Sequence, residues 1–101
     1  MGIYAQHNGD TSIITIDKEQ LLGIENIKFH SLVRDSIEAG SKDILVDLAK
    51  VKFITSLGVE GFLHARAICK DKNISFVLKN VNAAVMKILS TLRLTELFKF
   101  D

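Results

Sequence analysis

Apolar and polar positions repeat with two different periods along this chain, and each change of period marks the end of a strand or a helix. Ile3–His7 and Ser12–Ile16 are short β-prone runs that flank Asn8-Gly9-Asp10. Because Asn-Gly readily adopts the positive φ angles of a tight turn, the pattern predicts an antiparallel hairpin. A loop of mixed polarity is expected over residues 17–23.

Helical spacing begins at Ile24 and returns twice further along the chain. In the first helix, residues three and four apart share one face: Phe29, Leu32, Val33, Ser36 and Ile37. Gly40 supplies its stop signal. A second helix is predicted from about Leu57 to Asp71. A third is marked by an apolar stripe that we interpret as core: Val81, Val85, Ile88 and Leu92.

Short apolar runs between the helices predict the remaining strands. Asp43–Leu48 is nearly continuous in apolar residues, which is typical of a strand covered on both faces. Val51–Ile54 and Ile74–Leu78 are shorter, and Leu94–Phe100 holds a final turn and an edge strand. Helices and strands that alternate after a hairpin predict one α/β domain over residues 1–101. Its sheet is expected to be mostly parallel, with an antiparallel margin.

Composition narrows the classes of function. Of 101 residues, 48% are hydrophobic and 25% are charged, and the net charge is +1 with no basic block, so we expect no nucleic-acid partner. No apolar run approaches the length of a membrane span, and the first ten residues lack signal-peptide features, so neither membrane insertion nor export is expected. A single cysteine, Cys69, forms no internal disulfide and is expected to be a small core or boundary residue. These features predict a cytoplasmic protein.

No pattern for catalysis or metal binding stands out. His7, His30 and His64 are far apart in sequence and show no ligand spacing. The residues around Ser56 read Thr-Ser-Leu-Gly-Val, which is not the Gly-x-Ser-x-Gly motif of a nucleophile. Phosphate-cradling and dinucleotide motifs are absent from the sequence. We therefore expect no enzymatic activity, no cofactor and no small-molecule substrate.

Residues 46–59 resemble the signature of the STAS domain family. They include a strand that ends in Asp-Leu, a bend with an aromatic residue, and a Ser-x-Gly helix start. The family pattern at that start is Asp-Ser-Ser/Thr-Gly-Leu-Gly, and this chain has Thr55, Leu57 and Glu60 in place of the aspartate, the second hydroxyl residue and the second glycine. The resemblance implies a STAS-like α/β fold with helices packed mainly on one face of the sheet.

The resemblance also implies a regulatory role of the anti-sigma factor antagonist type. In such proteins the serine after the motif aspartate is the phosphoacceptor, and by position that serine is Ser56. The implied partners are a serine kinase that resembles an anti-sigma factor and a PPM-type serine phosphatase. The output of such a partner-switching pathway is transcription, secretion or biofilm formation.

Physical chemistry supports a switch at Ser56. A residue at a helix N-terminus lies beside unpaired backbone N–H groups, where a phosphate is tolerated. Glu60 follows one turn later, so a phosphate would create a concentrated negative patch that excludes a partner. The simpler interpretation is that Ser56 only caps the helix; Thr55 is the other candidate, and we favour Thr55 as the cap.

The predicted partner contacts surround this helix start. They are Thr55, Leu57, Gly58 and Glu60, with Glu19 and Gln20 from the neighbouring loop. Leu57 is a candidate apolar anchor, and Asp47 is expected to position the bend ahead of Ser56. The alternative function is a STAS subunit with no phosphorylation cycle, in a lipid-transport ATPase or a sensor complex.

Overall fold

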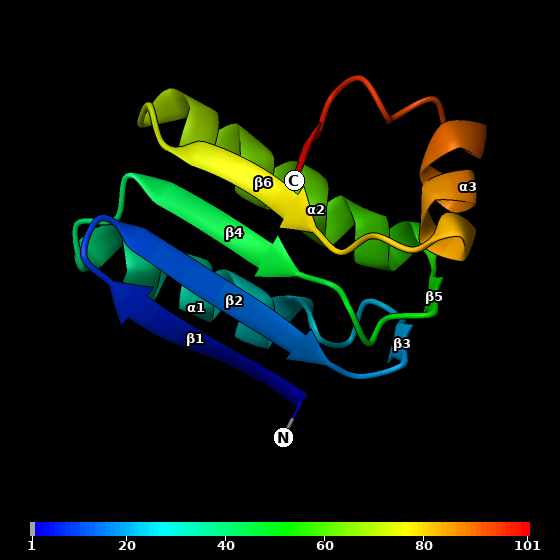
Figure 1. Cartoon of the computed structure of the whole chain (residues 1–101), viewed down its shortest axis with the longest axis horizontal. Coiled ribbons are helices and arrows are strands. Elements are labelled where there is room, and N and C mark those ends of the chain that lie inside the picture. The colour runs from blue at the N-terminus through cyan, green and yellow to red at the C-terminus, as the bar shows by residue number, and fades with distance from the viewer. Residues whose placement is uncertain (1) are drawn as a thin grey trace.

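The computed structural model describes residues 2–101 and contains a five-stranded mixed sheet (Figure 1). The strand order is β1-β2-β4-β6-β7, and only the β1–β2 pair is antiparallel. The strands are β1 (Gly2–Asn8), β2 (Thr11–Asp17), β4 (Asp43–Asp47), β6 (Ser75–Lys79) and β7 (Lys99–Phe100). Gly9 has a positive φ of 64° in the turn between β1 and β2, so the predicted hairpin is confirmed.

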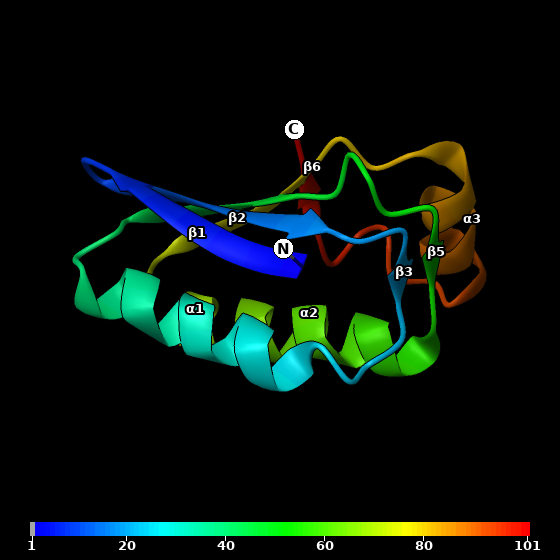
Figure 2. The same ribbon diagram turned by 90° about the horizontal axis from the view of Figure 1, so that it is seen from below.

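Two helices cover one face of this sheet. Figure 2 shows α1 (Asn26–Glu38) and α2 (Ser56–Asp71) side by side beneath the strands, while α3 (Ala83–Thr91) stands at one end. A second, two-stranded parallel sheet pairs β3 (Gln20–Leu21) with β5 (Phe53–Ile54). Part of the predicted loop at residues 17–23 is therefore a strand, and this small sheet leads directly into α2.

The core lies between the sheet and the two helices. The predicted stripe of α1 is buried at Phe29, Leu32, Val33 and Ser36. The buried face of α2 is formed by Gly58, Val59, Gly61, Phe62, Ala65 and Cys69. The prediction that Cys69 is a core or boundary residue is confirmed, and its exposed fraction of 0% places it in the core.

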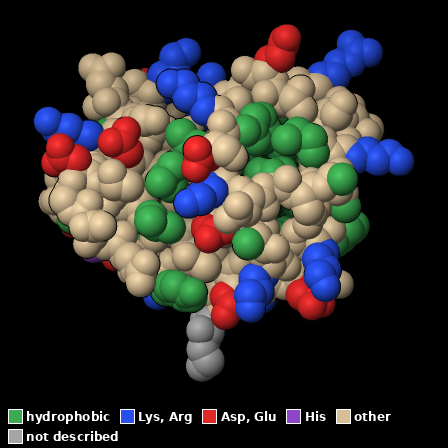
Figure 3. All heavy atoms as spheres, viewed as in Figure 1, with side chains coloured by type: hydrophobic (Ala, Val, Ile, Leu, Met, Phe, Trp, Pro, Cys, Tyr) green, Lys and Arg blue, Asp and Glu red, His purple; other side chains and the backbone are tan. Residues whose placement is uncertain are grey.

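The opposite face of the sheet has no helical cover, which corrects the expectation for Asp43–Leu48. Leu45 is only half-buried, because it points away from the helices on the same side as Tyr4, Ile13 and Val77. Figure 3 looks onto this face and shows hydrophobic side chains interspersed with charged ones. Leu92 is a second correction: it follows the last residue of α3 and is 42% exposed, so it is not core.

Among residues 2–101, no helix has the combination of length and apolar character that crossing a bilayer requires.

Candidate functional site

Ser56 is the first residue of α2, and its side chain is exposed. Thr55 precedes it in an extended conformation, and the Oγ1 atom of Thr55 accepts a hydrogen bond of 3.2 Å from the backbone N–H of Gly58. The favoured assignment of the helix cap to Thr55 is therefore confirmed. Because Thr55 makes the cap, the hydroxyl of Ser56 is not needed for it and faces solvent beside the first N–H groups of the helix.

Thr55 also ties α2 to the segment that leads into α1. Its Oγ1 donates a hydrogen bond of 2.9 Å to the carbonyl of Leu22, and its backbone N–H donates to the carbonyl of Leu21. An ionised aspartate, the residue of the family signature, accepts hydrogen bonds but donates none. A hydroxyl at position 55 therefore does what that aspartate cannot: it caps the helix and holds the neighbouring loop at once.

Close backbone packing fixes the same junction. A Cβ atom on Gly58 would lie 2.6 Å from the carbonyl oxygen of Leu21 and 2.9 Å from Cγ1 of Ile54. Gly23, with φ of 112°, lies so close to α2 that a Cβ there would be 2.7 Å from Cβ of Leu57. Gly58, one of the predicted partner contacts, is buried: it packs inward and lets the helix start approach β3.

A buried carboxylate shapes the turn between β3 and α1. Both N–H groups of Leu22 and Gly23 donate to Oε1 of Glu25 at 3.0 Å, and Lys18 forms an ion pair with Oε2 at 3.2 Å. Burial raises the pKa of Glu25, but the backbone hydrogen bonds and Lys18 outweigh it, so the pKa lies below its usual value. The ionised side chain thus holds the turn that carries Ile24.

Exposed apolar side chains lie on the segments that meet at the start of α2, and we call this set the tip patch. Two members, Ile24 and Ile27, are 81% and 85% exposed, and Leu57 is 58% exposed. The full set is Leu22, Ile24, Ile27, Phe53 and Leu57. The sequence singled out only Leu57. Ile27 could have been identified from the sequence, because it is an apolar residue that does not belong to the predicted buried stripe of α1. Contiguous exposed apolar residues on a small protein mark interaction surfaces.

The polar residues predicted around Ser56 come from two segments. Glu60 is exposed one helical turn after Ser56. Glu19 and Gln20 are exposed and lie beside β5, because the backbone N–H groups of Lys52 and Phe53 donate to the carbonyl of Glu19. Glu19 also forms an exposed ion pair with Lys52 at 3.5 Å. The small β3–β5 sheet therefore brings the two predicted segments together.

Asp47 holds the bend that follows β4. Its Oδ1 accepts hydrogen bonds of 3.0 Å from the N–H of Ala49 and from the side-chain amide of Asn80. These contacts join the bend to the loop after β6, and they fit a positioning role.

Two histidines that are distant in sequence meet between the helices. Nδ1 of His64 on α2 lies 3.2 Å from Nε2 of His30 on α1. Burial lowers the pKa of His30, and the nearby charges of His64 and Arg34 lower it further. Sequence spacing gave no sign of this pair. Within residues 2–101, no group of three or more metal-ligating side chains comes together.

Comparisons with known proteins agree with this geometry. The family model described as the STAS domain matches residues 3–101. A candidate anti-sigma factor antagonist of Thermotoga maritima is 22% identical, with 97% of this chain and 84% of that chain covered and a TM-score of 0.84. No curated protein sequence matches.

The anti-sigma factor antagonist SpoIIAA is similar in two solved forms. Its unphosphorylated form is 15% identical, with 99% of this chain and 88% of that chain covered and a TM-score of 0.81. Its phosphorylated form, from Bacillus, is 13% identical, with coverages of 99% and 91% and a TM-score of 0.74. At these identities the likeness establishes the fold.

Proposed function

This chain belongs to the STAS domain family, and on that premise we propose that it is a non-enzymatic regulatory protein whose binding to a partner is controlled by phosphorylation of Ser56. The observation that carries the proposal is the exposed hydroxyl of Ser56 at the start of α2, next to Leu57 of the tip patch. A kinase can reach this hydroxyl without unfolding the domain, because Thr55 has taken over the helix cap.

The folded domain should tolerate a phosphate at this position. The phosphate would add a charge of about −1.5 to −2 near the positive end of α2. The helix dipole favours such a charge by roughly 0.3–1 kcal/mol. Phosphorylation is therefore expected to leave the fold intact.

A partner that covers the tip patch would not tolerate the same group. Docking on Ile24, Ile27 and Leu57 removes water from the surface around Ser56, and a dianion buried there without a counter-charge costs several kcal/mol or more. Glu60 adds a like charge one turn away. Phosphorylation would thus favour release of the partner.

The partners we propose follow from the family role. They are a serine kinase that resembles an anti-sigma factor and binds the unmodified form, and a PPM-type phosphatase that restores it. One matched neighbour, SpoIIAA, has been solved in both unphosphorylated and phosphorylated forms, which supports a switch built on this fold. The proposed setting is a cytoplasmic bacterial partner-switching pathway that controls transcription, secretion or biofilm formation.

Intact mass measurement tests the modification directly. Protein isolated from its native cells should carry a fraction with the added mass of one phosphate, and Ser56→Ala should lack that fraction. Protein that never carries phosphate, under growth and stress conditions alike, would exclude the phosphorylation cycle.

Binding measurements test the consequence. Ser56→Asp should fold like the wild type and lose at least about tenfold in affinity for the partner that co-purifies with the wild type. Ser90→Asp makes the same change at an exposed position on α3 and should bind normally. Equal affinity of Ser56→Asp and the wild type would overturn the switch.

A second candidate is a STAS subunit of a lipid-transport ATPase or a sensor complex, with no phosphorylation cycle. Position 55 favours it, because the family signature has an aspartate there and this chain has Thr55, which links α2 to the neighbouring loop by hydrogen bonds. In that case the tip patch would be a permanent interface, and the protein would co-purify with transporter subunits without ever carrying phosphate.

A further inference from the structure

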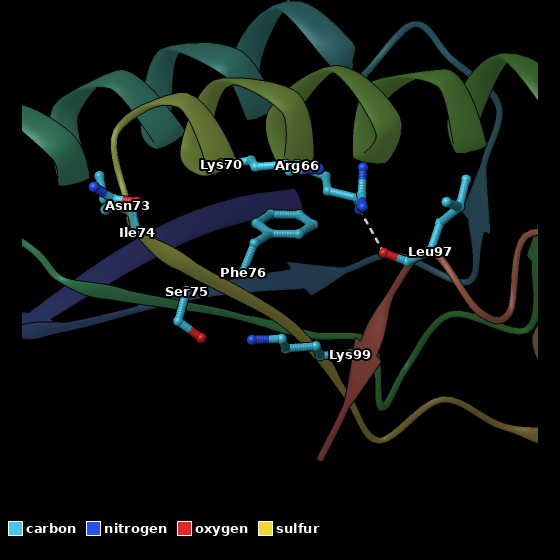
Figure 4. Close-up of a pocket in the computed structure, with 8 residues that line it drawn as sticks. All are labelled: Arg66, Lys70, Asn73, Ile74, Ser75, Phe76, Leu97 and Lys99. Carbon is cyan, nitrogen blue, oxygen red and sulfur yellow. Dashed lines mark hydrogen bonds between the residues drawn. The ribbon is translucent and has the colours of Figure 1, made fainter.

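The end of α2 opposite Ser56 borders an open groove of about 450 Å³. The groove lies between the last turns of α2, the first half of β6 and the segment that enters β7 (Figure 4). It exists because β7 pairs with β6 only at Val77 and Leu78, so no strand runs beside Ser75 and Phe76 on that side. Its size falls within the roughly 300–1,000 Å³ typical of ligand pockets.

The groove is lined by cations and by no carboxylate. Arg66, Lys70 and Lys99 contribute their side chains, and neither Asp nor Glu is among the lining residues. The ion pairs within residues 2–101 use Lys18, Lys50 and Lys52. None of the three groove cations therefore has a carboxylate within ion-pair distance in that part of the chain. Arg66 and Lys70 are four residues apart on α2, so an anion beside them would relieve their repulsion.

Arg66 is held in place for such a contact. Its Nε donates a hydrogen bond to the carbonyl of Leu97, drawn as a dashed line in Figure 4. A guanidinium has five N–H donors, so four remain on its terminal nitrogens. Because the side chain is already fixed, less conformational entropy is lost when it binds an anion.

Apolar and neutral polar groups complete the lining. The ring of Phe76 lies between the α2 side chains and Lys99 in Figure 4, and Ile74 and Leu97 extend this apolar wall. Asn73 and Ser75 add an amide and a hydroxyl at the other end of the groove. A small apolar body with one strongly anionic group matches this combination.

A purely structural role accounts for only part of the arrangement. Lys70 lies in the last turn of α2, where a cation offsets the helix dipole. That explanation does not extend to Arg66, which lies five residues before the end of α2, or to Lys99 on β7.

We propose that this groove binds a small phosphomonoester with an aromatic or similarly apolar body. Arg66 and Lys70 together match a phosphate of charge about −1.5 to −2 better than they match a single carboxylate, and Lys99 adds a third positive charge to the groove on the other side of the Phe76 ring. The site is independent of the proposed switch. Ser56 and Lys70 lie at opposite ends of α2, roughly 20 Å apart at about 1.5 Å per residue.

Titration of ¹⁵N-labelled protein with phenyl phosphate at constant ionic strength tests the proposal. We expect saturable amide shifts confined to the groove, at Arg66, Ser75, Phe76 and Lys99. Lys70→Gln and Lys99→Gln should each weaken binding about fivefold, and the double variant should weaken it more. Benzoate should bind more weakly than phenyl phosphate.

Controls separate a specific site from general charge effects. Lys87→Gln removes the same charge from an exposed position on α3 and should leave the affinity unchanged. Ser56→Ala should also bind as the wild type does, whatever the outcome at the switch. Shifts that do not saturate, or an equal loss in Lys87→Gln, would overturn the proposal. Equal affinity for inorganic phosphate would overturn the ligand class, and saturation by an acidic peptide alone would make the groove a protein-docking site instead.

Discussion

Gly58 is the residue whose lack of a side chain matters most for the position of the α2 start. A methyl group there would meet the backbone carbonyl of Leu21, and backbone moves less readily than the end of a side chain. Overpacking of this kind costs about 1–3 kcal/mol, whereas the gain in helix propensity from Gly to Ala returns only about 1 kcal/mol.

Because the clash is with a backbone atom, the cost is expected in the upper part of that range, about 2–3 kcal/mol, and Gly58→Ala should lower the free energy of unfolding by about 1–2 kcal/mol. Thermal unfolding followed by circular dichroism should show a Tm lower by roughly 4–16 °C. Ser56→Ala, at the neighbouring exposed position, should change the Tm by little. A Gly58→Ala protein as stable as the wild type would mean that β3 can move away from α2 at no cost.

The two hydrogen bonds of Thr55 lead to a second prediction at the residue scale. Thr55→Ala removes both the cap and the bond to Leu22, and should lower the free energy of unfolding by about 1–2 kcal/mol. Thr55→Ser keeps a hydroxyl that can donate and accept, and should retain most of the stability. Urea denaturation of the two variants makes the comparison, and an equal loss in both would show that the Thr55 methyl group, rather than its hydroxyl, holds the junction.

Contacts between α1 and α2 run along one line. Near the start of α2, the side-chain amide of Asn26 donates a hydrogen bond of 3.0 Å to the carbonyl of Leu57. Gly61 leaves room for the same side chain, because a Cβ there would overlap Asn26. One turn further along each helix, His30 meets His64. The histidine pair is thus part of the joint that sets the spacing of the two helices.

This joint is expected to weaken in mild acid. The folded-state pKa of His30 lies below its ordinary value of 6.5, so the unfolded chain binds a proton that the folded chain resists. Stability is full above pH 6.5 and falls as the pH drops through 6.5 toward the lower folded-state value. Denaturation midpoints in urea between pH 7.5 and 5.5 should decline, above the range in which most carboxylates titrate.

Substitution identifies the source of that decline. Arg34 on α1 and His64 on α2 are the charged or titratable groups that act on His30, and Glu60 lies one turn before His64. His30→Gln should flatten the pH profile. A profile unchanged by His30→Gln would place the proton-sensitive group elsewhere.

At the scale of the whole molecule, local periodicity predicted most of the elements. The turn at Asn8-Gly9 and the stripe from Phe29 to Ser36 depend on residues close together in sequence, and both are present. The hydrophobic run at Asp43–Leu48 was misjudged because sequence does not tell which face of a strand is covered. Leu45 is an apolar residue of an apolar run whether or not a helix packs over it, so the sequence pattern is the same in both cases.

The site was predictable only where one motif contained it. Ser56 and Thr55 were found from residues adjacent to them, and the structure places both at the start of α2. Gly23 and Asn26, which precede Ile24 and Ile27, contact Leu57 of α2, and His30 meets His64 across two helices. Proximity of this kind arises from tertiary packing, which a single sequence encodes but does not display.

The lone cysteine offers a readout of the stability of the entire fold. Cys69 is fully buried on α2, and burial raises the pKa of its thiol to about 11. A thiol reagent attacks the thiolate, so the folded protein should react only when it opens. For a domain of ordinary stability, labelling at pH 8 should be about 10³-fold or more slower in native buffer than in concentrated urea.

Adding Ala67→Cys, at an exposed position on the same helix, should give one fast-reacting thiol in addition to the slow one. Two fast thiols would mean that the second half of α2 opens without global unfolding, so that the groove beside it is not a rigid site.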